Sequence, residues 1–402
     1  MLDDKDVAAL REGTFTRDCL TMELISQSRP QPRRFTGPGF FRQSPTRRLE
    51  FTIYCVEATD VGTYFDDLVA TTAAVLVPDQ DFFQLRATDW LGAVWESERI
   101  VPDASFGSSG TIVRGFLNAI GTSEEYRGSE NFHGIAGRIF SDFEIPANLR
   151  TESSETVGGK ERRRSAQWRG LKVESCGATL VAHPEPGILT IEARATNALP
   201  PRFETRVLET LQFLLARHLQ WDTVTRIGNG TCETTIAGRP TPKTASQYWE
   251  PLALVHARDQ TGTEAFCRLF DAYLRHIIHF TDDRWHPLTV DLNAVSRAAA
   301  SSLETHVLVL AVAVESILRN AFPDFGQPSR DLLTELDKTL ERVDQWALSA
   351  ELHRRIRGSL GAMKSPRAAD QLRDLVRRGL IEDQKRVAWE KLRLQARTGT
   401  SF

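Results

Sequence analysis

The sequence is poor in lysine and in cysteine, and it has no long apolar run. Of its 50 basic residues, 8 are lysines and 42 are arginines. This ratio is typical of a GC-rich genome, so a single arginine says little about function. The formal net charge of −3 argues against a protein that binds polyanions over its whole surface, although it permits a local basic face.

The five cysteines are widely scattered and odd in number. No C-x-x-C pair occurs, so the usual zinc-binding spacing is missing and the pattern does not suit a disulfide framework. Free thiols of this kind fit a reducing cytosol. The residues concerned are Cys19, Cys55, Cys176, Cys232 and Cys267.

No segment has the pattern of an export signal or a membrane span. The N-terminal stretch MLDDKDVAALREG is acidic and lacks an apolar core, unlike a secretory signal. The longest strongly apolar run, Val307–Val314, has less than half the length that a spanning helix needs. With 402 residues, 41% of them hydrophobic and 26% charged, we expect a cytoplasmic globular protein of two domains with no membrane partner.

The motifs of common enzyme classes are also missing. Two glycine-rich stretches, FGSSGT at 106–111 and IGNGT at 227–231, are not followed by Gly-Lys-Ser/Thr and are predicted to be turns. There is no G-x-S-x-G elbow and no H-E-x-x-H. His276 and His279 lie three residues apart without an acidic partner motif, which favours surface or interface histidines. We expect neither a metal site nor a cofactor.

The first half of the chain has the pattern of β-strands. Segments such as LEFTIYCVE (49–57) and TIVRGFLNAI (111–120) are rich in β-formers, and Gly or Pro stands at nearly every junction. One apolar stripe at helical spacing predicts a helix at about 204–221. The polar segment 151–168 is predicted to be a loop, and its KERRR run is more typical of a solvated loop than of a nucleic-acid contact. The pattern predicts an antiparallel sheet or sandwich with one helix.

After about residue 260 the apolar period becomes that of α-helices. The tract 291–322 is apolar nearly all round at HVLVLAVAVESIL, which predicts one long helix in the middle of a bundle, ended by Pro323. Ser329 is predicted to begin another helix, and the last one runs from about 381 to 397. The fold class is therefore α+β, with a β-rich domain at 1–250 and an all-α domain at 262–402.

Glu315 directly follows the run of eight apolar residues, and Arg319 lies four residues further on. A carboxylate in apolar surroundings is costly unless it is paired. Two interpretations stay open. Residues 308, 312, 315 and 319 form the one face of the helix that reaches solvent, or Glu315 turns inward and orients an arginine on a neighbouring helix.

The last predicted helix has a basic flank. Arg386, Arg393 and Arg397 line it beside Trp389, and residues 351–402 carry more basic than acidic side chains, unlike the chain as a whole. Such a flank can hold a phosphodiester backbone, although it is more often simply solvated.

Three segments of the helical half resemble the HEPN superfamily. In chain order they are LETHVLVLAVAVESILRNAF, SPRAADQLRDLVRRGLI and VAWEKLRLQARTG, and the resemblance covers about residues 262–399. They are most similar to the C-terminal domain of ApeA-type bacterial anti-phage proteins, which also carry a β-rich N-terminal domain. The resemblance implies a helical bundle that dimerises, with an Arg-x4–6-His motif from each protomer forming a composite, metal-independent ribonuclease site. There the arginine neutralises the scissile phosphate and the histidine is the general acid and base.

The resemblance assigns roles to residues near the end of the chain. It places Arg393 at the arginine position and Thr398 at the histidine position, where threonine cannot transfer a proton near neutral pH. Arg386 and Arg397 would add RNA contacts, and Glu315 would support the site. Relatives continue beyond this point into another helix, so the ending is expected to lack both the catalytic base and the last bundle helix.

The one Arg-x4–6-His match in the sequence, Arg127 to His133, lies in the β-rich half and is rejected as the site. The sequence thus predicts an anti-phage defence protein of the abortive-infection or toxin type, with RNA (tRNA or mRNA) and a phage-derived trigger as partners. Its enzymatic activity stays open, because catalysis needs another base, such as His276, His279 or His353. The alternative is a non-catalytic binding protein whose helical domain serves dimerisation.

Overall fold

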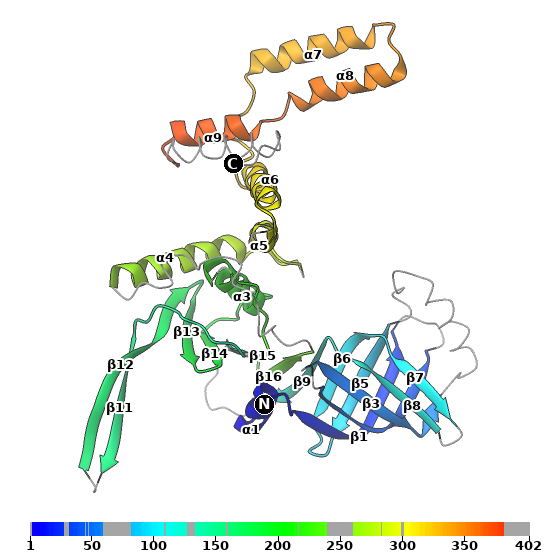
Figure 1. The fold of residues 1–402 in the computed structure, drawn as a ribbon, viewed down its shortest axis with the longest axis vertical. Coiled ribbons are helices and arrows are strands. Elements are labelled where there is room, and N and C mark those ends of the chain that lie inside the picture. The colour runs from blue at the N-terminus through cyan, green and yellow to red at the C-terminus, as the bar shows by residue number, and fades with distance from the viewer. Residues whose placement is uncertain are drawn as a thin grey trace. The chain divides into compact units, whose positions relative to one another are not determined.

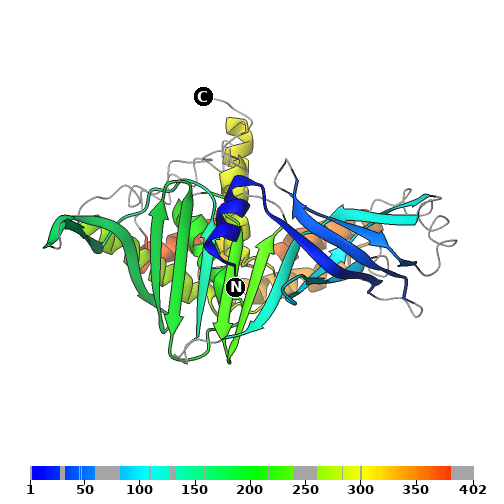
Figure 2. The ribbon, with the colours of Figure 1, turned by 90° about the horizontal axis from the view of Figure 1, so that it is seen from below.

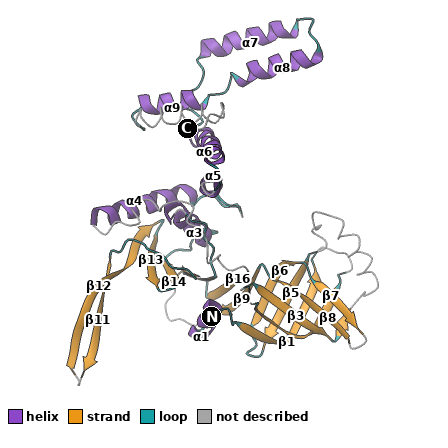
Figure 3. Cartoon of the chain, viewed as in Figure 1, coloured by secondary structure: helices purple, strands orange, loops and turns teal. Residues whose placement is uncertain are grey.

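The computed structural model describes residues 2–381, apart from 28–31, 45, 47, 59–81, 108–109, 127–132, 158–159, 216, 239–259, 283 and 299–300. The chain divides into two compact units. One comprises 1–246 with 250–283, and the other 247–249 with 284–402. A large antiparallel sheet dominates the first unit and helices form the second (Figures 1 and 3), so the predicted α+β class is confirmed.

Sixteen described strands form the sheet, and each neighbouring pair is antiparallel. Their bounds are β1 (Thr16–Ser26), β2 (Arg34–Gln43), β3 (Leu49–Cys55), β4 (Glu57–Ala58), β5 (Phe83–Asp89), β6 (Val94–Ile100), β7 (Asp103–Gly107), β8 (Gly110–Phe116), β9 (Ala119–Glu125), β10 (His133–Ile139), β11 (Leu149–Val157), β12 (Lys160–Ser175), β13 (Ala178–Glu185), β14 (Ile188–Ala195), β15 (Thr223–Gly228) and β16 (Thr231–Ala237). The spatial order is β11-β12-β13-β14-β10-β15-β16-β9-β6-β5-β1-β2-β3-β8-β7, and β4 pairs with β2.

The N-terminal part of this sheet curls around an aromatic core. Phe41 on β2 and Trp95 on β6 are three strand spacings apart in the sheet order, which is about 14 Å in a flat sheet. Their ring centroids nevertheless lie 5.4 Å apart, so the strands between them bend inward. The helix α1 (Asp4–Glu12), which the sequence analysis did not predict, contributes Leu10 to the same core.

Gly137 makes room for Trp221, which is hydrogen-bonded to the helix α3 (Phe203–Leu215). A Cβ atom on Gly137 of β10 would lie 2.4 Å from the ring of Trp221, so only glycine leaves room for the indole there. The indole Nε1 of Trp221 donates a hydrogen bond to the carbonyl oxygen of Glu204 at 3.1 Å. The Glu204 carboxylate in turn accepts one from Arg226 of β15 at 2.8 Å. These contacts tie the start of α3 to the strands beneath it.

The helix α4 (Gln260–Ile277) packs beside α3 on the face of β12–β14, as Figures 1 and 2 show. Phe213 of α3 stacks on Tyr273 of α4 with ring centroids 4.5 Å apart. The sequence analysis assigned this helix to a helical domain at 262–402. In the structure α4 belongs to the first compact unit, and the second unit takes up the chain from Arg284.

The segment predicted to be a loop, 151–168, forms strands instead. Residues 149–157 of β11 pair with residues 160–170 of β12, and only the later part of β12 (171–175) joins β13 in the main sheet. Backbone hydrogen bonds between strands need no apolar side chains, so a polar composition did not prevent strand formation here. The ribbon is visible as the pair β11 and β12 in Figure 3.

The helical unit contains α5 (Pro287–Ala298), α6 (Leu303–Ala321), α7 (Arg330–Asp344), α8 (Ala350–Ala362) and α9 (Ala368–Arg377). The single helix predicted at 291–322 is two helices, because Ser302 caps a new start by accepting a hydrogen bond from the backbone of Thr305 at 3.3 Å. The predicted end before Pro323 and the predicted start at Ser329 are both confirmed. The sequence analysis did not predict α8.

The described part of α6 is not central to a bundle. Its C-terminal end packs against α9 through Leu318, Leu372 and Leu375. The amide of Gln371 on α9 donates hydrogen bonds to two carbonyl groups at the end of α6, at 3.1 and 2.9 Å. Towards the start of α6, however, Leu308 is 52% exposed, so the prediction of a helix buried on all sides is wrong for these residues.

An ion pair with no exposure to solvent lies on the helix α3. The side chains of Arg206 and Glu209, both on α3, form it within one turn. Arg206 also donates from Nη2 to the carbonyl oxygen of Asp282 at 2.8 Å, and its guanidinium carbon lies 4.9 Å from the ring centroid of Phe280. A single side chain therefore attaches α3 to the segment that follows α4.

Replacing Arg206 with methionine should remove the cation that pairs with the buried Glu209 carboxylate. We expect the free energy of unfolding to fall by about 3–5 kcal/mol in urea denaturation. The double variant Arg206→Met/Glu209→Leu removes both charges and should recover most of that loss. As a control, Arg275→Ala breaks an exposed ion pair with Asp271 on α4 and should leave the urea midpoint unchanged. A double variant as unstable as the single one would show that the charge of Glu209 is not the cause of the loss.

Candidate functional site

The structure places Glu315, the one predicted site residue within the described part of the chain, on a partly exposed stripe of α6. Leu308 and Val312 are 52% and 57% exposed, Glu315 is half-buried, and Arg319 is exposed. These positions follow one another at intervals of three or four residues. The exposure of Leu308, Val312 and Arg319 agrees with a solvent-facing side of the helix, whereas the half-buried Glu315 leaves both interpretations of its role open.

Four other predicted residues lie outside the described residues. They are Arg386, Arg393, Arg397 and Thr398, together with the last predicted helix at 381–397. The roles that the resemblance implies for these residues stay predictions.

The histidines considered as replacement bases lie in different units. His276 and His279 are exposed on α4 and just beyond its end, in the first unit, and the prediction of surface histidines agrees with this. His353 lies on α8 in the helical unit. Of these three histidines, His353 is in the same unit as Glu315.

His353 belongs to a cluster formed where α7 and α8 meet. Its Nε2 lies 3.0 Å from Oδ1 of Asp344, the last residue of α7. One turn further along α8, Arg357 donates from Nη1 to both carboxylate oxygens of Asp344, each at 2.6 Å. The sequence analysis missed this cluster, because the residues are 9 and 13 positions from Asp344 and only the hairpin of the two helices brings them together.

Asp344 links the other two side chains of this cluster. Hydrogen bonding from Arg357, and to a lesser extent from His353, holds the pKa of the Asp344 carboxyl below its usual range. Asp344 therefore stays ionised and can fix the imidazole ring in one orientation, as a carboxylate does for a catalytic histidine. An oriented histidine beside an arginine has the components needed for proton transfer next to a bound phosphate. The same contacts also close the helical hairpin, which is the simpler role.

In the described part of the chain, no three His, Cys, Asp or Glu side chains converge as a metal site requires. Among the described helices, none combines the length and the apolar character needed to cross a membrane. All five cysteines are free thiols. Burial raises the pKa of the Cys19 thiol to about 12, with Asp89 and Asp18 adding to the effect, and burial raises that of Cys55 to about 11. These two thiols are therefore poor nucleophiles.

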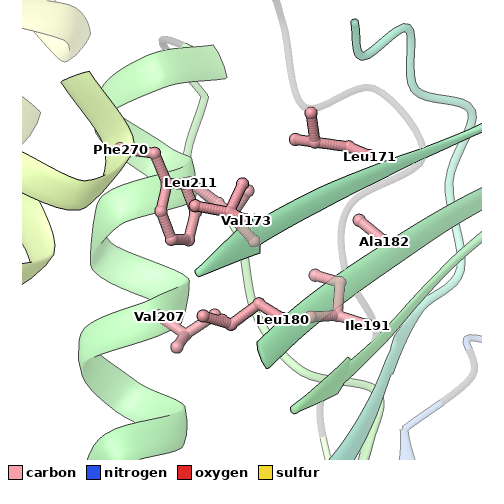
Figure 4. Close-up of a pocket in the computed structure, with 8 residues that line it drawn as sticks. All are labelled: Leu171, Val173, Leu180, Ala182, Ile191, Val207, Leu211 and Phe270. Atoms are coloured by element: carbon pink, nitrogen blue, oxygen red, sulfur yellow. The ribbon is translucent and has the colours of Figure 1, made fainter. Parts of the chain in front are cut away.

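An apolar hollow lies between the sheet and the helices α3 and α4 (Figure 4). Its empty volume is about 260 Å³, counting the space open to solvent at its mouth. No polar group lines it, so it offers nothing that would orient a polar substrate. We interpret it as incomplete packing between the layers. The lining residues are Leu171, Val173, Leu180, Ala182, Ile191, Val207, Leu211 and Phe270.

A scan against protein-family models, a search of curated proteins and a search of solved structures each found nothing that matches this chain.

Thiol labelling should show that Cys19 reacts more slowly than Cys176. At pH 8 a thiol of pKa about 12 is ionised in about one molecule in ten thousand, so Cys19 should resist iodoacetamide in the native protein. Half-buried Cys176 should be labelled first, and peptide mass spectrometry can follow both sites. In urea the two should react at similar rates. Rapid labelling of native Cys19 would show that its surroundings open far more than the structure indicates.

Filling the apolar hollow should stabilise the first unit. Ala182→Val adds two methyl groups on a strand that borders the hollow, and we expect a gain of about 0.5–1 kcal/mol in urea denaturation. Ala193 is a matched control, because it is buried on the neighbouring strand β14 but does not line the hollow. Ala193→Val should overpack the core and cost about 1–3 kcal/mol. Equal effects of the two substitutions would mean that the hollow has no spare room.

Proposed function

We propose that this chain is a cytoplasmic bacterial defence protein of the abortive-infection type, with a HEPN ribonuclease-like helical domain that acts on or binds RNA. The β-rich unit would then sense a phage-derived trigger. The observation that carries the proposal is the order of three segments in the helical half, around α6, around α9 and in the stretch 387–399. They resemble the HEPN domain of ApeA-type proteins in order and spacing.

The exposed stripe of α6 supports dimerisation in this proposal. Leu308 and Val312 lie four residues apart and each exposes more than half of its surface. Large apolar side chains grouped on a helix commonly mark an interaction surface. A homodimer through the helical domain would cover them, and Glu315 would then stand at the margin of the contact.

The missing family histidine is the main difficulty for catalysis. Thr398 stands at its position and cannot shuttle a proton near neutral pH. His353 is the replacement that the described geometry favours, because Asp344 orients it and Arg357 lies beside it. In this scheme Arg393 neutralises the phosphate while His353 takes the proton of the attacking 2′-hydroxyl, the bond from phosphorus to the 5′-oxygen breaks as the 2′,3′-cyclic phosphate forms, and the leaving 5′-oxygen takes the proton from His353. Arg386 and Arg397 would hold the RNA backbone.

The test is RNA cleavage by the purified chain in EDTA, using total tRNA and an mRNA fragment. The parent should cleave, and both Arg393→Ala and His353→Gln should lower the rate by at least about 100-fold, as expected when a proton-transfer or charge-stabilising group is lost. Arg355→Ala is the matched control, since it removes an exposed arginine of α8 that pairs with Glu351, and it should leave the rate unchanged.

The outcomes separate the two candidate functions. Loss of cleavage in Arg393→Ala with full activity in His353→Gln would keep the nuclease and assign its base elsewhere. No cleavage by the parent, with a dimer found by light scattering, would instead favour the alternative: a non-catalytic binding protein whose helical domain serves dimerisation. Thr398 is the residue that favours this alternative.

A further inference from the structure

The outer face of the strands β1, β2, β3, β8 and β7 carries aromatic and arginine side chains, although such a face is normally polar. The strands are adjacent in this order, and β1, β3, β7 and β8 lie together in Figure 1. Tyr54 and Phe116 are each 49% exposed, while Phe40 between them is half-buried. The opposite face of the same strands is core, with Phe41, Phe51 and Val113 buried. The aromatic residues outside are therefore not part of the hydrophobic core.

The strand register shows how this face is laid out. Asp18, Phe40, Thr52, Arg114 and Asp103 are successive register partners across the five strands. The neighbouring row on the same face contains Thr16, Arg42, Glu50 and Phe116. Tyr54 lies on the other side of the first row, two residues from Thr52 along β3. The aromatic residues thus lie in the middle strands, and the acidic residues Asp18 and Asp103 lie at the two margins.

Two of the rings carry a guanidinium group over them. The guanidinium carbon of Arg48 lies 4.0 Å from the ring centroid of Phe116, and that of Arg42 lies 5.1 Å from that of Phe40. The rings of Phe40 and Tyr54 are 6.5 Å apart. Unpaired bases commonly stack on aromatic rings and on the flat faces of guanidinium groups. The N–H groups of such arginines stay available to contact phosphates.

We infer that this face, which we name the aromatic platform (Phe40, Tyr54, Phe116, Arg42, Arg48 and Arg114), binds single-stranded nucleic acid. The face offers flat rings rather than a pocket, which suits bases better than the protruding side chain of a protein partner. Its three arginines supply the positive charge, although Arg42 shares its charge with Glu50 at 2.8 Å.

The charges also predict the path of the strand. Asp18 and Asp103 at the margins repel phosphates, so the backbone should run along β3 rather than across the five strands. Phe116 is the register partner of Glu50 on β3, and Glu50 is four residues from Tyr54 on the same strand. Along a strand, four residues span about 13 Å. Sheets with exposed aromatic residues of this kind stack two or three bases. The ligand is therefore a short unpaired stretch of RNA or DNA. If the β-rich unit senses a trigger, as the proposed function holds, that trigger would include such a stretch.

The experiment measures binding of fluorescein-labelled single-stranded RNA, single-stranded DNA and duplex DNA to the full chain by fluorescence anisotropy. Single strands should bind more tightly than the duplex, and the comparison of RNA with DNA identifies the natural source. Tyr54→Ala and Phe116→Ala should each weaken binding about tenfold, because each removes one stacking surface. Arg114→Ser should reduce the slope of log K against log salt by about 0.7, the value for one phosphate contact on a single strand.

Three further variants distinguish stacking on a ring from general apolar contact. Trp346→Ala removes a side chain of similar exposure, 54%, from the turn between α7 and α8, and should leave binding unchanged. Tyr54→Phe keeps a ring and should bind like the parent, whereas Tyr54→Leu keeps apolar surface without a ring and should bind like Tyr54→Ala. Urea midpoints of all variants must match the parent, so that a loss of binding is not a loss of folding.

Other results would overturn the inference. The inference is wrong if none of the oligonucleotides binds. It is also wrong if Tyr54→Ala and Phe116→Ala bind them as tightly as the parent does. A change in oligomeric state in Tyr54→Leu, without any effect on oligonucleotides, would instead make the face a contact between copies of the chain. Measuring Arg393→Ala in parallel keeps this test separate from the proposed function. Binding to the platform should survive that substitution even if cleavage is lost or was never present.

Discussion

A buried arginine constrains the first unit more than any other single group. Arg206 has no access to water, so its charge has to be balanced where it lies, and Glu209, Asp282 and Phe280 surround it. Glu209 on the same helix balances the charge, while the carbonyl oxygen of Asp282 and the ring of Phe280, both beyond the end of α4, complete the surroundings of the guanidinium group. Separating α4 from α3 would therefore remove a hydrogen bond and a cation–π contact from a buried cation.

Much of the architecture follows from local patterns in the sequence. The alternation in 49–57 and 111–120 and the Asn229-Gly230 turn correspond to β3, β8 and the β15–β16 hairpin. Predictions were wrong where tertiary contacts decided the outcome. The polar segment 151–168 became a ribbon through backbone pairing, and α4 has a helical pattern that says nothing about which unit it joins. Even the strand order, with β9 beside β16, cannot be inferred from local propensities.

The site was less predictable than the fold, for physical reasons. Single residues such as Glu315 can be placed on a helical face from spacing alone, and its partly exposed stripe agrees with that. The cluster of His353, Asp344 and Arg357 depends on how two helices meet. The aromatic platform depends on strand order and register, which bring Phe40, Tyr54 and Phe116 together from three strands. An alternating strand pattern identifies two faces but does not say which neighbours share them.

The pairing of β9 with β16 has a consequence for how the protein is made. These strands cover residues 119–125 and 231–237, and they join the curled N-terminal part of the sheet to the rest. During synthesis, more than a hundred residues must be added after β9 before its partner strand β16 has been made. An open strand edge invites wrong pairing with other chains, and long-range sheet contacts form slowly. The edge of β9 is therefore open to wrong pairing until residues 231–237 have been synthesised.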